Sequence, residues 1–575
     1  MNKNYPIYTT TFIDDMRSLV EEAAQNFPDS IAISYKNHHS DKEVQKVTFT
    51  QWRDDVRNIG TALVAEGLRE EKIAIIGENS YGWCCSFFGV MAVGSVTVPV
   101  DKELPIEDID GIITTTGCKA VIFGKAAETK IKEILQKGGL KPVEILVSIA
   151  PENTLQADGK VSKTLAQLQN RGEELYKNGD NSYYDYKIDV TKLASIVFTS
   201  GTTGKGKGVM LSQANICLDM TLGMYNFDIT RKTLHVLPPH HTFGSTVNYV
   251  GHLSQGCEVY ISSGLKHVSD EIKEQQPTHL ILVPAFLEAM NRKIWTTARK
   301  TGKEGLLKMM MKVSDGLRKV GIDLRKKLFS SVLSAFGGRL ELIICGGAKL
   351  DEEIIRTFDS LGITILNGYG ITECAPLISA NRNKYRKPGS VGTPILACRV
   401  KIDNPDENGE GEICVKGPNV MLGYYNNPEA TAEVFDKDGF FHTGDYGKLD
   451  DEGWIYITGR KKNLIILSNG KNVYPEEIEA DLQKVEGVCE VVVYAGESRV
   501  QKDKIIIVAE IYPDADQLKD KGITDLQTYF ENQVKLLNAS MPSYKAVKRV
   551  KLRDTEFQKN TSRKIIRFSI DKTID

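Results

Sequence analysis

Short apolar runs alternate with longer helix-compatible stretches over most of the chain. The runs are KIAIIG (72–77), AVIFG (120–124), LASIVFTS (193–200), THLILVP (278–284), LELIICGG (340–347) and ITILNGYG (363–370). Most of them end in Gly or Pro, which are residues that terminate strands. This alternation predicts an α/β fold in which parallel or mixed sheets are covered by helices.

The pattern changes after Arg460. A helix candidate, PEEIEADLQKV, is followed by the strand candidates CEVVVYA and KIIIVAEIY, the helix candidate DLQTYFENQVKLL and the strand candidate AVKRVKL. This order is typical of a small α+β domain. We therefore predict a large domain over residues 1–460 and a small C-terminal domain over residues 461–575.

The uncharged segment 79–100 is long enough to span a bilayer, but Gly82, Gly89, Gly94 and Pro99 interrupt it. We predict a buried helix from about Tyr81, a turn at residues 94–95 and then an inner strand. A second segment, 291–338, is rich in Lys and Arg and has the spacing of amphipathic helices. It is interpreted as a solvated helical cap, and contact with a membrane surface is compatible with this interpretation.

Composition narrows the function classes. The chain has 73 Lys and Arg against 75 Asp and Glu, a formal net charge of −2, which argues against a nucleic-acid-binding protein. Its 10 Cys are scattered without metal-ligand spacing, which indicates reduced thiols in a cytoplasmic protein. The first residues lack the pattern of a signal peptide.

The stretch TSGTTGKGKG begins at Thr199 and resembles a phosphate-binding loop. Its spacing fits a Walker P-loop up to Lys207, but Gly208 stands where that loop needs a hydroxyl for Mg²⁺. A short apolar run and a helix-capping Ser212 follow, so the order is strand, glycine loop, short strand, helix. An ordinary solvated turn is the alternative. The candidate triphosphate-binding residues are Thr199, Ser200, Gly201, Thr202, Thr203, Gly204 and Lys207.

With the motifs downstream, this loop resembles the signature of the adenylate-forming superfamily, which includes acyl-CoA synthetases, luciferases and peptide-synthetase adenylation domains. Gly206 replaces the Pro that is usual in that signature. The motifs that follow match in the same order. The resemblance implies the acyl-CoA synthetase-like fold, with a large N-terminal domain and a small mobile C-terminal domain.

The resemblance also implies roles for the middle of the chain. LPPHHTFG (237–244) is similar to a segment that lines the acyl pocket, with His241 as a wall residue. CGGAKL (345–350), with Gly347 and Ala348, resembles the loop on the adenine side.

NGYGITECAP (367–376) is a more specific match to the superfamily than the two preceding motifs. By resemblance, Tyr369 stacks on adenine beside Gly370, Thr372 contacts the α-phosphate and Glu373 binds Mg²⁺. A carboxylate is a hard oxygen ligand, as neutralising phosphate charge requires.

The segment 438–463, DGFFHTGDYGKLDDEGWIYITGRKKN, closely resembles the fatty-acyl-CoA synthetase signature. Asp445 then holds the ribose hydroxyls, and Arg460 assists at the ribose and phosphate. Lys462 falls at the hinge position between the domains. Asn463 stands where Asp is common in related enzymes.

Two assignments come from the end of the chain. LSNGKNVYPEEIE (467–479) resembles the loop that moves in for the second half-reaction, with Gly470 along the coenzyme A tunnel. FQKNTSRKIIR (557–567) places Lys564 at the catalytic lysine, although Gln558 and Arg563 replace the usual Pro and Gly.

The implied activity is ATP- and Mg²⁺-dependent activation of a medium-to-long-chain fatty acid, followed by transfer to coenzyme A. The fatty-acid prediction rests on VPAFLEAMNRKIW (283–295) and the helical segment after it, which resemble long-chain fatty acyl-CoA synthetases. Three alternatives stay open: a ligase that uses acyl carrier protein, a stand-alone adenylation enzyme for an amino acid, and a non-catalytic nucleotide-binding protein.

Overall fold

A computed structural model describes residues 8–150, 155, 157, 159–199, 206–229, 231–467, 471–497, 505–559 and 565–574. Packing divides the chain into two compact units. Unit 1 comprises Met1–Arg399 and Lys416–Phe435, and unit 2 comprises Val400–Val415 and Asp436–Asp575. Residues 400–415 and 436–460 thus pack with the C-terminal part. The division into a large domain over residues 1–460 and a small domain over residues 461–575 stays a prediction.

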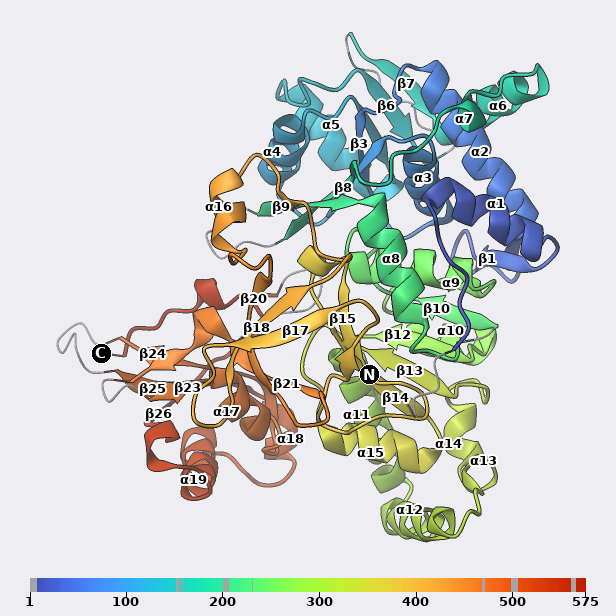
Figure 1. Cartoon of the computed structure of the whole chain (residues 1–575). Helices are drawn as coiled ribbons and strands as arrows, with labels where there is room; N and C mark the ends of the chain where they lie inside the picture. Colours follow the sequence, from blue (N-terminus) through green and yellow to red (C-terminus); the bar gives the residue numbers. More distant parts are fainter. Residues whose placement is uncertain are drawn as a thin grey trace. The chain divides into compact units, whose positions relative to one another are not determined.

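The first sheet of unit 1 has parallel strands at its centre and antiparallel pairs at both ends (Figure 1). The predicted strands at 278–284, 340–347 and 363–370 are neighbours in it. In spatial order its strands are β16 (Thr393–Pro394), β15 (Leu377–Ala380), β14 (Thr364–Gly370), β13 (Leu342–Cys345), β12 (His279–Leu282), β10 (Lys232–His235), β11 (Glu258–Ile261), β1 (Ile31–Tyr35) and β2 (Gln45–Thr48).

The second sheet of unit 1 contains the other three predicted strands. It is parallel except for the antiparallel pairs that β9 makes with its two neighbours. Its spatial order is β19 (Gly423–Tyr424), β9 (Lys207–Ser212), β8 (Leu193–Thr199), β4 (Val96–Val100), β3 (Lys72–Ile76), β5 (Ala120–Phe123), β6 (Ile145–Ser148) and β7 (Val161–Thr164).

Helices connect these strands, which confirms the predicted α/β class. Their bounds are α1 (Met16–Asn26), α2 (Phe49–Ala65), α3 (Tyr81–Ala92), α4 (Ile106–Thr116), η1 (Lys125–Ala127), α5 (Glu128–Gln136), α6 (Leu165–Lys177), α7 (Ser182–Asp185), α8 (Gln213–Met224), the π-helix η2 (Phe243–Gly251), α9 (His252–Ser254), α10 (Val268–Gln275), α11 (Pro284–Lys300), α12 (Glu304–Lys319), α13 (Arg325–Leu328), α14 (Ser330–Ser334), α15 (Glu352–Leu361), η3 (Thr372–Cys374) and α16 (Pro428–Glu433).

Segment 79–100 folds as predicted. Helix α3 is buried along nearly its whole length, Gly94 takes a left-handed turn, and β4 is buried at every position. Gly82 is required by packing, because a Cβ there would lie 2.5 Å from Cγ2 of Ile149. Across the residues that the structure describes, no helix combines the length and apolar character needed to cross a membrane.

Unit 2 contains a four-stranded sheet, a short hairpin and a second, three-stranded sheet among its described residues. The strands are β17 (Arg399–Asp403), β18 (Gly411–Lys416), β20 (Phe441–Leu449), β21 (Ile455–Arg460), β22 (Ile465–Ile466), β23 (Asn472–Val473), β24 (Val488–Gly496), β25 (Ile506–Pro513) and β26 (Arg549–Leu552). The helices are η4 (Lys461–Asn463), α17 (Pro475–Leu482), α18 (Ala515–Lys519), α19 (Leu526–Ala539), η5 (Ser543–Lys545) and η6 (Arg567–Ser569). The elements predicted after residue 460 are all present.

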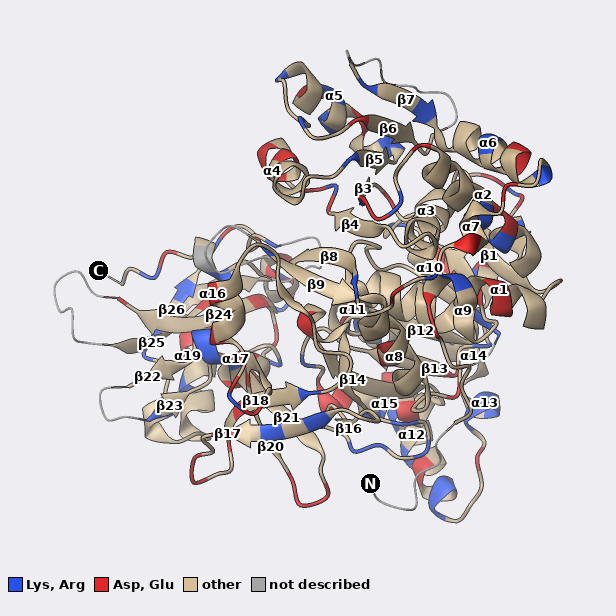
Figure 2. Cartoon of the chain, turned by 45° about the horizontal axis from the view of Figure 1, so that its top comes forward, with Lys and Arg blue, Asp and Glu red and all other residues tan. Residues whose placement is uncertain are grey.

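Charges of both signs are interspersed over the helices and loops that Figure 2 shows, in line with the balanced composition. All 10 cysteines are free thiols, and all but Cys489 are buried. Burial raises the pKa of several of them, including that of Cys118 to about 11, so these thiols stay protonated at neutral pH.

Candidate active site

The glycine-rich stretch joins two antiparallel strands. Thr199 ends β8 and pairs with Lys207, which begins β9. Gly206 fits this geometry, because a Cβ there would lie 2.7 Å from the Thr199 carbonyl oxygen. Ser212 caps α8 by accepting from the Asn215 N–H, as predicted. The intervening candidates Ser200, Gly201, Thr202, Thr203 and Gly204 lie outside the described residues.

Lys207 and Glu373 meet around one tyrosine. The Lys207 Nζ lies 4.6 Å from the centre of the Tyr424 ring. The hydroxyl of that tyrosine donates to Oε1 of Glu373 over 3.1 Å. We call these three residues the Tyr424 cluster. A cation and a carboxylate that are far apart in the sequence thereby contact one tyrosine, the cation at its ring and the carboxylate at its hydroxyl.

Backbone pairing builds the Tyr424 cluster. Strand β19 pairs antiparallel with β9, so that Tyr424 lies opposite Val209. The Met421 N–H donates to the Glu373 carbonyl oxygen over 2.8 Å. Tyr424 was not a sequence candidate. Its segment, GYYNNPEAT, has turn-forming residues, but nothing in it marks a contact with charged groups.

The segment that carries Glu373 is held by a buried carboxyl group. Both oxygens of Asp219, which is fully buried on α8, lie 3.2 Å from the Leu377 N–H. Burial raises the pKa of Asp219 well above its ordinary value. Asn419 donates to the Leu377 carbonyl oxygen over 2.6 Å. These two residues support the site, and no sequence pattern marks either of them.

The adenine-side candidates and Thr372 lie at or just after the ends of two neighbouring strands, β13 and β14. Tyr369 is buried in β14, and the half-buried Thr372 begins η3. Gly370 is required by close approach, because a Cβ there would lie 2.2 Å from the Pro376 carbonyl oxygen. Gly347 follows β13 with a φ of +88°, a conformation that favours glycine, and Ala348 comes next on the exposed turn.

His241, the acyl-pocket candidate, lies directly before the π-helix η2. Its ring is half-buried, with its centre 4.5 Å from that of His240. Its carbonyl oxygen accepts from the Gly244 N–H over 2.8 Å. Long π-helices are rare and occur often at functional sites.

The ribose candidates pair across two strands of unit 2. Asp445 on β20 lies opposite Arg460 on β21, and the Arg460 Nε is 2.7 Å from Oδ1 of Asp445. The Asp445 backbone N–H donates to the hydroxyl of Thr443 over 3.1 Å. Asp445 is buried, and Arg460 is partly exposed. The structure brings these two predicted residues together.

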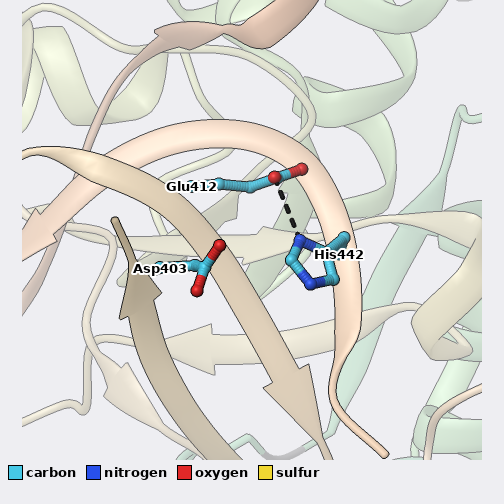
Figure 3. A group of neighbouring side chains, drawn as sticks. All are labelled: Asp403, Glu412 and His442. Atoms are coloured by element: carbon cyan, nitrogen blue, oxygen red, sulfur yellow. Dashed lines mark hydrogen bonds and ion pairs between the residues drawn. The ribbon is translucent and has the colours of Figure 1, made fainter. Parts of the chain in front are cut away.

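Beside them lies a group of side chains that sequence reasoning missed. Glu412 on β18 contacts Nδ1 of His442 at 3.0 Å (Figure 3). It also contacts Nζ of Lys461 at 2.7 Å and accepts from the Gly444 N–H at 3.1 Å. We call Glu412, His442 and Lys461 the Glu412 cluster.

Asp403 lies near enough for Asp403, Glu412 and His442 to be considered as metal ligands. The Lys461 ammonium and the His442 ring already contact Oε2 of Glu412, and Gly444 donates to Oε1. Burial raises the pKa of Glu412, but Lys461 and His442 outweigh it and hold the pKa below its ordinary value. The arrangement therefore fits a structural ion-pair network better than a metal site.

The hinge candidate Lys462 is exposed in η4. Its neighbour Asn463 donates to Oε1 of Glu476 over 2.6 Å. An Asp at position 463 would set two carboxylates against each other, so the unusual residue fits its partner. Gly470 lies outside the described residues.

Lys564 also lies outside the described residues, but its flanks are anchored. Lys559 and Ile565 pair as an antiparallel bridge. Arg567 forms an ion pair with Glu479 on α17 and donates to the Val493 carbonyl oxygen over 3.1 Å. Burial raises the pKa of Glu479 to about 7 although Arg567 opposes the shift.

The family model described as AMP-binding enzyme matches residues 20–425. The chain belongs to this family. The AMP-binding enzymes similar to it include long-chain-fatty-acid–CoA ligase 1 of Cavia porcellus, which is 29% identical over 88% of this chain and 75% of the relative.

Another similar AMP-binding enzyme is the chloroplastic long-chain-fatty-acid–[acyl-carrier-protein] ligase AEE15 of Arabidopsis thaliana, 27% identical over 84% of this chain and 75% of the relative. Among solved structures, o-succinylbenzoate CoA synthetase (MenE) of Bacillus subtilis with ATP and a magnesium ion matches with a TM-score of 0.70 and 21% identity over 96% of this chain and 98% of the other. This likeness confirms the fold. The chain is an AMP-forming ligase that activates an acid as its adenylate.

Proposed function

We propose that this AMP-binding enzyme activates a medium-to-long-chain fatty acid with ATP and transfers the acyl group to coenzyme A. In the first step, the carboxylate attacks the α-phosphorus, and pyrophosphate leaves with the electron pair of the broken P–O bond. In the second step, the thiolate of coenzyme A attacks the acyl carbon, and AMP leaves. Two different sets of groups must act on one carbon, which suits a hinged small domain.

The Tyr424 cluster is the observation that carries the first step. Attack on a polyphosphate needs positive charge at the phosphates. Lys207 supplies one cation for the departing pyrophosphate, together with the glycine loop. The carboxylate of Glu373 is a hard oxygen ligand that suits Mg²⁺. Bound there, Mg²⁺ would neutralise phosphate charge.

Among the described residues, the Tyr424 hydroxyl is the one side-chain group hydrogen-bonded to the Glu373 carboxylate. Thr372 would contact the α-phosphate. Tyr369 and the turn at residues 347–348 would bind adenine.

The proposed roles in unit 2 complete the scheme. Asp445 would accept from the ribose hydroxyls, and Arg460 would assist at the ribose and phosphate. Lys564 would stabilise the attacking carboxylate, Lys462 would be the hinge, and Gly470 would line the coenzyme A tunnel. The pairing of Arg460 with Asp445 supports the ribose assignment, because the arginine orients the carboxylate.

Fatty-acid specificity is supported by the helices after β12 and by the long-chain fatty-acid ligases among the relatives. His241 would then be a wall of the acyl pocket. We propose a cytoplasmic location, because all 10 cysteines are free thiols. Acyl carrier protein is the alternative acceptor, since one relative is a ligase for that acceptor. An amino-acid substrate stays a second alternative.

The test is carboxylate-dependent exchange of labelled pyrophosphate into ATP, measured with fatty acids of increasing chain length. We expect exchange that requires Mg²⁺ and is fastest with medium-to-long acids. Exchange driven by amino acids instead would overturn the substrate class. Absence of exchange with every carboxylate would indicate a non-catalytic nucleotide-binding protein.

A second measurement assigns the acceptor. The protein is given the preferred acid, ATP and either coenzyme A or acyl carrier protein, and the thioester product is identified by mass. We expect acyl-CoA. Lys564→Ala should abolish pyrophosphate exchange and still allow thioester formation from a supplied acyl-adenylate, because only the first step needs a cation at the carboxylate.

A further inference from the structure

The outward face of α12 carries a row of exposed apolar side chains. Leu306, Met309, Val313 and Val320 follow one another at spacings that place them on one side of a helix. The exposed fractions of Met309, Val313 and Val320 are 56%, 53% and 72%. Ile322 and Leu324 extend the exposed apolar surface beyond the end of the helix. We call these six residues the α12 apolar face.

The opposite side of α12 is fixed to the rest of unit 1. Leu307 is buried in the core that also contains residues of α11 and α15. Arg318 forms an ion pair with Asp359 on α15 at 2.9 Å, and Asp315 accepts from the hydroxyl of Ser360 at 2.9 Å. The helix already has a buried side. The α12 apolar face is therefore a second apolar surface, which folding leaves in water.

The surroundings of the α12 apolar face are strongly basic. Residues 299–327 contain ten Lys and Arg against three Asp and Glu, so their formal charge is +7 in a chain whose net charge is −2. The three acidic residues pair within this segment, Glu304 with Lys308, Asp315 with Arg318 and Asp323 with Arg325. The positive excess is exposed at Lys300, Lys303, Lys312, Lys319 and Lys327.

We propose that the α12 apolar face docks on the surface of an anionic lipid bilayer. A helix that combines an apolar stripe with lysines lies in the plane of the membrane interface, with its apolar side chains at headgroup depth. The stripe from Leu306 to Val320 is about 21 Å long at the rise of an α-helix. Lys312 and Lys319 lie beside the stripe, where they face lipid phosphates when the apolar side chains insert.

The positive charge around the α12 apolar face favours an anionic bilayer over a neutral one. The continuous row of apolar side chains favours a bilayer over a purely polar partner. An acidic carrier protein and a second copy of this chain are the competing occupants. The inference goes beyond the proposed function, and its test measures binding without catalysis.

The experiment is co-sedimentation of the full chain with vesicles of phosphatidylcholine alone or mixed with phosphatidylglycerol, at low and high salt. We expect binding to the mixed vesicles that falls as salt rises, and weak binding to the neutral vesicles. The double variants Met309→Ser with Val313→Ser and Lys312→Glu with Lys319→Glu should each bind the mixed vesicles at least about tenfold more weakly.

Matched controls come from α19, where Lys535 and Leu536 are also exposed. Lys535→Glu with Leu536→Ser should bind as the wild type does. All changed side chains are exposed, and circular dichroism and the melting temperature check that each variant is folded.

Three results would overturn the proposal. The first is wild-type protein that does not distinguish mixed from neutral vesicles. The second is equal binding by the wild type and the α12 variants. The third is a wild-type protein that does not bind vesicles but self-associates, as measured by light scattering, or binds acidic carrier protein, together with α12 variants that lose that self-association or binding.

Discussion

The Tyr424 cluster of unit 1 and the Glu412 cluster of unit 2 both bring a lysine near a carboxylate, but they are built differently. Lys207, Glu373 and Tyr424 come from three distant segments, and each of the two charged side chains contacts the tyrosine. In the Glu412 cluster, side chains come from β18 and β20 of one sheet and from Lys461, which directly follows β21. Lys461 contacts Glu412 directly.

The difference indicates what each cluster is for. Among the described residues, the Glu373 carboxylate accepts one side-chain hydrogen bond, so it retains lone pairs for a cation. Glu412 accepts from two side chains and a backbone N–H, which uses its capacity to hold protein groups in place. The first arrangement suits ligand binding, and the second suits positioning of β20, the strand that carries Asp445.

The largest expected effect is on the Tyr424 cluster. Glu373→Gln keeps the side-chain volume but removes the charge, so Mg²⁺-dependent turnover should fall on the order of 100-fold and recover in part as Mg²⁺ is raised. Turnover is measured over a series of Mg²⁺ concentrations, and the melting temperature should stay unchanged. Unaltered metal dependence would show that Glu373 is not the ligand.

The next effect separates the two half-reactions. Lys462→Pro fixes φ near −65° next to Lys461 of the Glu412 cluster. We expect pyrophosphate exchange to persist and acyl-CoA formation to slow at least about tenfold, because a rigid hinge traps one conformation. Lys462→Ala is the control and should do much less. If both half-reactions slow equally, the hinge lies elsewhere.

Acid should destabilise unit 1 and stabilise unit 2. Burial lowers the pKa of His235 to about 3 and that of His252 to about 4 in unit 1. Their neutral forms stabilise the fold above about pH 6.5, and this stability is lost as pH falls, by about 2 kcal/mol at pH 5.5. In unit 2, burial raises the pKa of Glu479 to about 7, so its contribution is largest at low pH and is lost as pH rises towards 7.

Hydrogen exchange measured separately for peptides of each unit, between pH 7 and pH 5.5, tests this difference. Unit 1 should lose protection and unit 2 should keep it. His235→Leu removes one titrating group and should make the pH dependence of unit 1 shallower. Earlier loss of protection in unit 2 would contradict the assignment.

Glu412→Gln should lower the free energy of unfolding of unit 2 by about 1 kcal/mol, since the exposed Lys461 regains water while the contact between the buried Glu412 and the partly buried His442 weakens. Chemical denaturation followed by tryptophan fluorescence, with Lys535→Ala as a surface control, measures the change. ATP affinity should weaken as well, because the backbone of β20 next to Asp445 loses a support. A variant with unchanged stability and affinity would remove the positioning role.

The smallest effect is expected for Tyr424→Phe. It removes one hydroxyl from the Glu373 carboxylate and keeps the ring beside Lys207, so turnover should fall only about threefold to tenfold. Tyr424→Ala removes the ring too and should be clearly worse. Equal values for the two variants would mean that the ring does not hold the two charged residues.

Local sequence patterns determined much of the fold. The interrupted apolar segment 79–100 became a helix, a turn and a strand, because Gly and Pro act on the backbone near them. Ser212 capped α8 for the same local reason. The order of elements after residue 460 was also predicted correctly, since each helix and strand there shows its own hydrophobic periodicity. The glycine loop and Lys564 stay predictions, because both lie outside the described residues.

Tertiary structure alone decided which segments meet. The pairing of β19 with β9 brings Tyr424 to Lys207, and packing assigns residues 400–415 and 436–460 to unit 2. No sequence pattern distinguishes Asp219 and Glu412 from surface acids. In the folded protein both are buried, and they accept from the backbone N–H groups of Leu377 and Gly444, respectively. Contacts of this kind depend on which distant strands pair, in which register, and on which side chains become buried as a result. Neither can be predicted from the periodicity of one sequence.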